Sequence, residues 1–128
     1  MFKYYTKTGK IGFHDAVFAR IAIDVAEKMG NAVIFTTAKG KPVKIGRDGD
    51  EKLNFIDITE GKEKNTIDME IYVILKFGNS ISRISQEFAR RVKAEVKAVT
   101  GVRVDKIRIV VKGVKSKNTV KRELEIKY

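Results

Sequence analysis

Alternating apolar and polar positions make residues 67–77 the clearest β-strand in the chain. Ile67, Met69, Ile71, Val73, Leu75 and Phe77 recur at every second position, and residues two apart lie on the same face of a strand. The positions between them include Asp68, Glu70, Tyr72 and Lys76. We therefore expect one face of this strand to pack on the core and the other to be more open.

The first predicted helix covers residues 15–29. Val17, Ile21 and Val25 repeat at intervals of four, which is the spacing of one helix face. His14 precedes the segment at the N-cap position, and Gly30 follows it as a natural left-handed cap.

The second predicted helix covers residues 80–100 and is strongly amphipathic. Ser80 can cap its start, and Gly101 ends it. Its apolar side chains form a single stripe along one face, made of Ile81, Ile84, Phe88, Val92, Val96 and Val99.

Shorter β-rich segments and turns fill the rest of the chain. Residues 1–8 are predicted as a first strand or a loose arm, and a phase slip near Asp105 predicts a β-bulge. The other predicted strands cover residues 10–13, 32–38, 43–47, 53–59, 102–112 and 120–128, with turns at 39–41, 47–50, 60–63 and 113–118.

These elements predict an α+β fold with two layers, in which two helices pack on one face of a largely antiparallel, mixed sheet. The length of 128 residues argues for a single domain. Within it, residues 1–9 form an N-terminal arm or strand, and residues 113–128 form a basic turn and a C-terminal strand. An edge strand at 120–128 could pair between chains, so a homo-oligomer is one expectation.

Positive charge gathers in the second half of the chain. The net charge is +11; residues 1–64 hold 12 basic and 9 acidic residues, whereas residues 65–128 hold 15 and 7. Such an excess favours anionic partners. The candidate partner- or anion-binding residues lie on the second helix and around the last turn: Arg83, Arg90, Lys93, Lys97, Lys112, Lys115 and Lys117.

Two interpretations of these basic residues stay open. One is a solvated surface that only keeps the protein soluble, and the other is a docking surface for an anion. If the anion is nucleic acid, phosphate contacts would make binding strongly salt-dependent. A basic nucleic-acid-binding module is therefore the alternative to a protein-binding function.

Residue types that most catalytic and metal sites need are scarce. The chain has no cysteine and a single histidine, His14, so neither a thiolate site nor a histidine cluster can form. Asp48, Asp50 and Glu51 do not follow a calcium-loop pattern and read as a solvated turn. Gly9-Lys10-Ile11-Gly12 has the G-x-x-G outline of an RNA-binding clamp but fits an ordinary turn better. We expect the protein to be non-enzymatic and to bind neither a metal nor a cofactor. We also expect neither a signal peptide nor a transmembrane segment.

The order of motifs from Gly9 to Gly113 resembles the alkaline shock protein family, also called the envelope stress response family, of Gram-positive and related bacteria. The resemblance is carried by four pieces of sequence, which are Lys10-Ile11-Gly12-Phe13, the run from Ile71 to Gly78 followed by Asn79-Ser80-Ile81, Arg91-Val92-Lys93, and Thr100-Gly101-Val102 with the strand that follows.

This resemblance implies a non-enzymatic protein that acts by binding other proteins. Members are cytoplasmic, and some are held near the membrane by a small membrane-anchored partner. Others are linked to envelope homeostasis or to control of fatty-acid synthesis. The resemblance thus implies an envelope-stress or regulatory scaffold with a protein partner. The net charge of +11 is unlike the members that are acidic.

Overall fold

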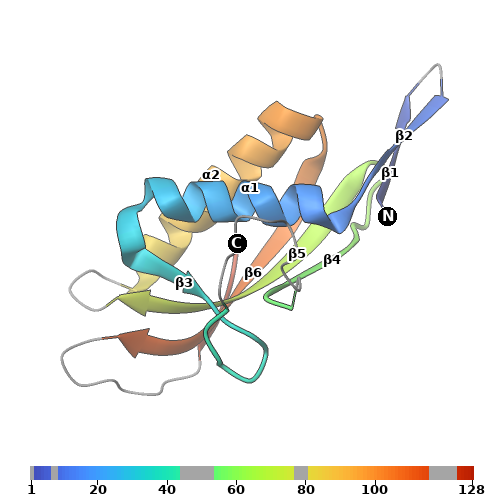
Figure 1. Cartoon of the computed structure of the whole chain (residues 1–128). Coiled ribbons are helices and arrows are strands. Elements are labelled where there is room, and N and C mark those ends of the chain that lie inside the picture. The colour runs from blue at the N-terminus through green and yellow to red at the C-terminus, as the bar shows by residue number, and fades with distance from the viewer. Residues whose placement is uncertain (1, 7–8, 44–53, 77–80, 116–123) are drawn as a thin grey trace.

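Two helices cover one face of a sheet in the computed structural model, which describes residues 2–6, 9–43, 54–76, 81–115 and 124–128. Figure 1 shows both helices on the same side of the main strands. The elements, in chain order, are β1 (Phe2–Thr6), β2 (Gly9–Phe13), α1 (Asp15–Lys28), the 3₁₀ turn η1 (Gly30–Ala32), β3 (Val33–Phe35), β4 (Ile56–Glu60), β5 (Thr66–Lys76), α2 (Ile81–Thr100), β6 (Arg103–Lys115) and β7 (Leu124–Lys127). The predicted two-layer α+β fold is confirmed.

The sheet is mixed and centres on β5 and β6. These two strands are parallel and are connected through α2, whereas β7 runs antiparallel to β6. On the other side of β5, β3 lies opposite residues 73–75 and β4 lies opposite residues 67–71, both antiparallel. The strands therefore succeed one another from β3 and β4 through β5 and β6 to β7.

The face of the sheet beneath the helices forms the core. The apolar residues of β5 predicted to face inward are at most 2% exposed, and their partners on β6 are also buried, as in the pair Ile71 and Ile109. Phe88 of α2 lies 6.1 Å from Phe35, whose ring lies 4.6 Å from that of Phe55, so aromatic contacts join helix and sheet.

Glycine ends both helices as predicted. Gly30 (φ 64°) follows α1, and Gly101 (φ 78°) follows α2 with its N–H donating to the carbonyl of Lys97 at 2.9 Å. Left-handed backbone favours glycine because a Cβ is unfavourable there. His14 is the N-cap of α1, as predicted, although its side chain makes no capping hydrogen bond. Ser80 lies outside the described residues.

The apolar stripe of α2 is half-buried at Ile81 and buried from Ile84 to Val96, but its predicted last member is not. Val99 is 59% exposed. It has the correct angular position, yet no described element covers the last turn of α2. Val99 instead borders a hollow between the helices, together with Val17 and Ile21 of α1.

The predicted bulge in β6 is confirmed at Asp105. Ile67 and Asp68 face Val104 and Lys106, which leaves Asp105 as the extra residue. A second register shift leaves Lys112 unmatched. The predicted turn at 113–118 is wrong at its start, because this shift carries Gly113 into line with Ile74 and β6 continues to Lys115. The rest of that turn lies outside the described residues.

The N-terminal segment is a strand, one of the two predicted forms. β1 and β2 pair antiparallel from Phe2↔Phe13 to Thr6↔Gly9, and Figure 1 shows this hairpin projecting from the body of the molecule. The G-x-x-G sequence lies within β2, so it does not join two helices as an RNA-binding clamp would.

The middle hairpin is described only around its turn. The Thr36↔Pro42 bridge confirms the turn at 39–41, and Val43 donates its N–H to Phe35 at 2.9 Å. The remainder of the predicted return strand, residues 44–47, lies outside the described part, as does the predicted turn at 47–50.

Candidate functional site

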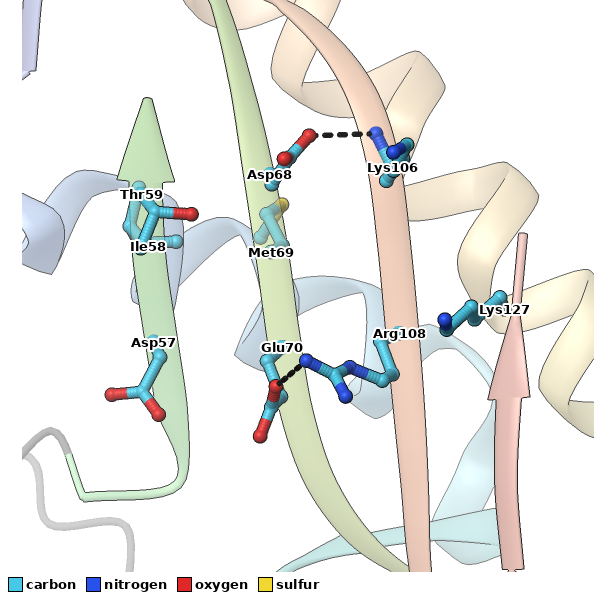
Figure 2. A pocket seen from close by; sticks show the side chains of 9 residues that line it. All are labelled: Asp57, Ile58, Thr59, Asp68, Met69, Glu70, Lys106, Arg108 and Lys127. Carbon is cyan, nitrogen blue, oxygen red and sulfur yellow. Dashed lines mark hydrogen bonds and ion pairs between the residues drawn. The ribbon is translucent and has the colours of Figure 1, made fainter. Parts of the chain in front are cut away.

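The sheet face opposite the helices carries a band of charged side chains (Figure 2). They surround a hollow of about 580 Å³ whose carboxylates come from β4 and β5 and whose cations come from β6 and β7. Nine residues line it: Asp57, Ile58, Thr59, Asp68, Met69, Glu70, Lys106, Arg108 and Lys127. The hollow therefore has an acidic side and a basic side.

Strand register places four of these residues in one line across the sheet. Asp57 lies opposite Glu70, Glu70 opposite Arg108, and Arg108 opposite Lys127. We call these four residues the charged row. Because each member belongs to a different strand, backbone hydrogen bonding fixes the order of two acidic and then two basic residues.

Arg108 is the centre of the charged row. Its Nη2 lies 2.6 Å from Glu70 Oε2, and its Nη1 donates to Glu125 Oε1 at 2.7 Å. The hydrogen bond to Glu125 and the nearby charge of Glu70 raise the pKa of Arg108. The same hydrogen bond lowers the pKa of Glu125. One guanidinium thus holds carboxylates from the strands on either side of it.

Tyr72 supports the acidic side of the row. Its hydroxyl donates to Glu70 Oε1 at 2.6 Å and lies 3.4 Å from Asp57 Oδ2. The hydrogen bond to Glu70 is the main cause that raises the pKa of Tyr72 well above its usual value, and desolvation by burial is the second. The phenol therefore remains a hydrogen-bond donor to Glu70 at neutral pH.

The bulge in β6 fixes the position of Asp68. The extra residue Asp105 interrupts the regular ladder, and Asp68 Oδ1 accepts the backbone N–H of Lys106 at 3.1 Å. A side chain thereby replaces a backbone partner that the bulge removes. The ammonium of Lys106 is not needed for that bond and lies on an exposed residue beside the hollow.

This arrangement suits recognition of a surface that bears both charges. Within the described part of the chain, no three His, Cys, Asp or Glu residues are grouped as ligands for a metal ion. His14 is exposed, and the hollow contains no histidine. Asp48, Asp50 and Glu51 lie outside the described residues.

The family model that matches residues 3–116 is that of the alkaline shock proteins, and its description gives a cell envelope-related function. The chain belongs to the alkaline shock protein family. The match confirms the resemblance predicted from the motifs and indicates a function related to the cell envelope. No curated protein and no solved structure matches the chain.

The alkaline shock protein match does not cover the whole candidate site. It ends at residue 116, so it spans β4, β5 and most of the basic side, but not β7. Lys127, the last member of the charged row, therefore lies beyond the matched residues. None of the helices described in this alkaline shock family chain is long and apolar enough to cross a membrane.

The basic residues predicted on the second helix all lie on α2. Arg83, Arg90 and Lys97 are exposed and Lys93 is half-buried. Glu87 accepts hydrogen bonds from Arg90 at 2.6 Å and from Arg91 at 2.7 Å, and these bonds lower its pKa to about 2. The charge of Arg90 is thus partly balanced on the helix itself.

The other predicted residues belong to the sheet layer. Lys112 is half-buried at the second register shift of β6, and Lys115 is the last residue of that strand. Lys117 lies outside the described residues. The structure therefore does not unite the α2 residues with Lys112 and Lys115 in one described site, and their role in binding stays a prediction.

The sequence alone did not predict the charged row, although alternation along the strands indicated which of its residues lie on the open face. Alternation along residues 67–77 correctly placed Glu70 on the open face. Arg108 and Lys127 likewise alternate with apolar residues on their strands. Their neighbours could not be identified, because alternation gives the face of each residue but not the order in which strands pair.

Proposed function

We propose that this alkaline shock family protein is a non-enzymatic scaffold that binds a protein partner through the open face of its sheet. The observation that supports this proposal is the charged row around the hollow. Its side chains belong to four paired strands, so backbone hydrogen bonding fixes their order before a partner binds. In keeping with the family's envelope-related function, the partner would be a regulatory or membrane-anchored protein at the envelope, or one that controls fatty-acid synthesis.

Opposite charges on the two sides of the hollow favour selectivity. A partner surface with a basic side facing Asp57 and Glu70 and an acidic side facing Lys106 and Lys127 would be attracted in one orientation and repelled in the reverse one. Such complementarity mainly governs orientation, association rate and the rejection of wrong partners. Individual exposed ion pairs contribute only about 0–1 kcal/mol, so the binding energy would come from the whole face.

Nucleic acid is less favoured as the partner of this face. Asp57, Asp68 and Glu70 would repel phosphates approaching the same hollow, and Arg108 is already paired with two carboxylates. Titration with RNA and DNA at two salt concentrations distinguishes this alternative. Micromolar binding at low salt that weakens as salt rises would favour nucleic acid.

The experiment that tests the proposal is affinity capture with mass spectrometry on wild type and two charge-reversed variants. Lys106→Glu reverses one cation beside the hollow and leaves the backbone N–H that Asp68 accepts. Lys97→Glu makes the same change on the exposed surface of α2 and serves as the matched control. Both variants lower the net charge by the same amount, so a loss from non-specific electrostatics would affect them equally.

We expect Lys106→Glu to lose a protein that wild type and Lys97→Glu both capture. If capture were lost with Lys97→Glu but not with Lys106→Glu, the binding surface would lie on α2, which carries the predicted residues Arg83, Arg90, Lys93 and Lys97. Capture that neither variant changes would contradict a role for either charged surface.

A further inference from the structure

β7 is the last strand of the sheet. Among the residues that the structure describes, Leu124–Lys127 pair only with β6, in the register from Arg108↔Lys127 to Val111↔Leu124. A strand in that position presents a row of backbone N–H and C=O groups to any further strand. The sequence and hydrogen-bond phase of β7 indicate which strand would fit.

The hydrogen bonds to β6 determine which backbone groups point away from the sheet. Ile107 donates to the carbonyl of Tyr128 at 2.9 Å, and Tyr128 donates to the carbonyl of Ile107 at 2.8 Å. In an antiparallel ladder such exchanging pairs recur at every second residue. Ile126, opposite Ile109, therefore directs its backbone groups towards β6, whereas Glu125 and Lys127 direct theirs towards the outer edge.

The two residues that direct their backbone groups outward, Glu125 and Lys127, have opposite charges. When a second β7 strand runs antiparallel about a two-fold axis at Ile126, Glu125 of each copy lies opposite Lys127 of the other. Each of these facing pairs exchanges both of its backbone hydrogen bonds, which gives four in total. The same register also forms two cross-strand ion pairs, so backbone phase and side-chain charge favour one alignment.

Neighbouring alignments that keep the same hydrogen-bond phase place like charges opposite each other. An axis at Glu125 would place two glutamates opposite each other, and an axis at Lys127 would do the same with two lysines. Like charges directly opposite each other on neighbouring strands are destabilising. In the described structure Glu125 uses Oε1 for Arg108, and its side chain remains 47% exposed, so it remains open to a cation of a second copy.

We propose that two copies of this chain associate through β7, around a two-fold axis at Ile126, to form one continuous sheet. Ile126 then meets its own copy as a non-hydrogen-bonded pair, in which side chains approach most closely. It lies on the helix side of the sheet, level with Ile109, so the contact at the axis is apolar.

The helices leave room for this pairing. α2 packs against β6, and the two β6 strands of the dimer would be separated by three strand spacings, or about 14 Å. Packed helices need only about 8–10 Å between their axes. The dimer uses a strand beyond the residues that match the family model. It shares Lys127 with the hollow, but it is tested by association of the chain with itself and does not require partner binding.

Sedimentation equilibrium on the 128-residue chain tests the proposal. The samples are wild type, Glu125→Lys, Lys127→Glu, the double exchange of both residues, and an equimolar mixture of the two single variants. Lys97→Glu on α2 has the same charge change as Lys127→Glu and is the control. A far-ultraviolet circular dichroism spectrum confirms that each variant is folded, since Glu125→Lys also removes the ion pair with Arg108.

We expect wild type and Lys97→Glu to dimerise alike. Each single variant turns two attractive pairs into two repulsive ones and should raise the dimer dissociation constant about tenfold or more. The double exchange should restore the wild-type constant within about threefold, because lysine and glutamate again face each other. Mixing the single variants should restore association as heterodimers for the same reason.

Three results would overturn the proposal. The first is a wild-type chain that stays monomeric at low salt up to millimolar concentration. The second is a dimer whose dissociation constant neither single variant changes, since its interface would lie elsewhere. The third is loss of the dimer in the single variants without recovery in the double exchange or the mixture, which would exclude the register at Ile126.

Discussion

The turn between β4 and β5 has no room for a side chain at Gly61. Its N–H donates to the carbonyl of Thr66 at 2.9 Å. A Cβ at this position would fall inside contact distance of Thr66 Oγ1, 2.9 Å from Thr66 Cβ and 3.0 Å from its carbonyl carbon. Thr66 is only 2% exposed, and its hydroxyl donates to the carbonyl of Glu63 at 2.6 Å. Because backbone atoms take part in the clash, the turn itself must open.

Gly61→Ala should therefore destabilise the protein by about 2 kcal/mol. Overpacking costs about 1–3 kcal/mol, and loss of the bond to Thr66 adds about 1 kcal/mol. Reduced freedom of the unfolded chain offsets this by about 0.4–1 kcal/mol. The turn also sets the register in which Asp57 meets Glu70, so its opening would disturb the acidic side of the hollow.

Urea unfolding followed by circular dichroism measures the free-energy cost of Gly61→Ala, both in the wild-type background and in the Thr66→Ala background. Removing Oγ1 relieves the closest contact, so Gly61→Ala should cost about 1 kcal/mol less in that background. Gly101→Ala is the control: no atom lies within 4 Å of its added Cβ, so its cost of about 1 kcal/mol comes from the positive φ and should not change with Thr66→Ala. A cost below about 0.5 kcal/mol, or one insensitive to Thr66→Ala, would refute the steric argument.

Three further perturbations test the core, the C-terminal contact and the acid response. Phe88→Ala should lower the free energy of unfolding by about 3–5 kcal/mol in the same urea assay, because its ring is 1% exposed; a loss under 1 kcal/mol would contradict the described packing. Ser85 Oγ lies 2.6 Å from Tyr128 Oη, so a double-mutant cycle of Ser85→Ala and Tyr128→Phe should give a coupling of about 1 kcal/mol, whereas additivity would exclude the contact. The lowered pKa of Glu87 stabilises the fold above its ordinary pKa of 4.5, and this contribution is lost as pH falls towards about 2. Glu87→Gln should flatten stability against pH in that window, and an unchanged slope would count against the pairing with Arg90 and Arg91.

Local pattern was sufficient to predict much of the fold. The strict alternation from Ile67 to Leu75 specifies a strand whatever its neighbours are, and a phase slip alone identified the bulge at Asp105. Both glycine caps could be predicted because left-handed backbone at a helix end favours that residue. These features depend on residues close together in the sequence.

Features that depend on distant contacts could not be predicted in the same way. Val99 continues the stripe of α2 but is exposed, since coverage depends on what packs over the last turn. Gly113 is typical of a turn, yet a register shift at Lys112 keeps it within β6. The charged row depends on four strands pairing in a particular order, whereas the basic residues of α2 could be grouped from the sequence because they are neighbours along one helix.

Site-specific photocrosslinking in cells tests partner binding through the open face most directly. A benzophenone amino acid would replace Thr59, an exposed residue that lines the hollow, or Ala94, an exposed residue of α2. We predict a discrete adduct with another protein from position 59 and none from position 94. An adduct from position 94 alone, or from neither position, would contradict the open face of the sheet as the binding surface.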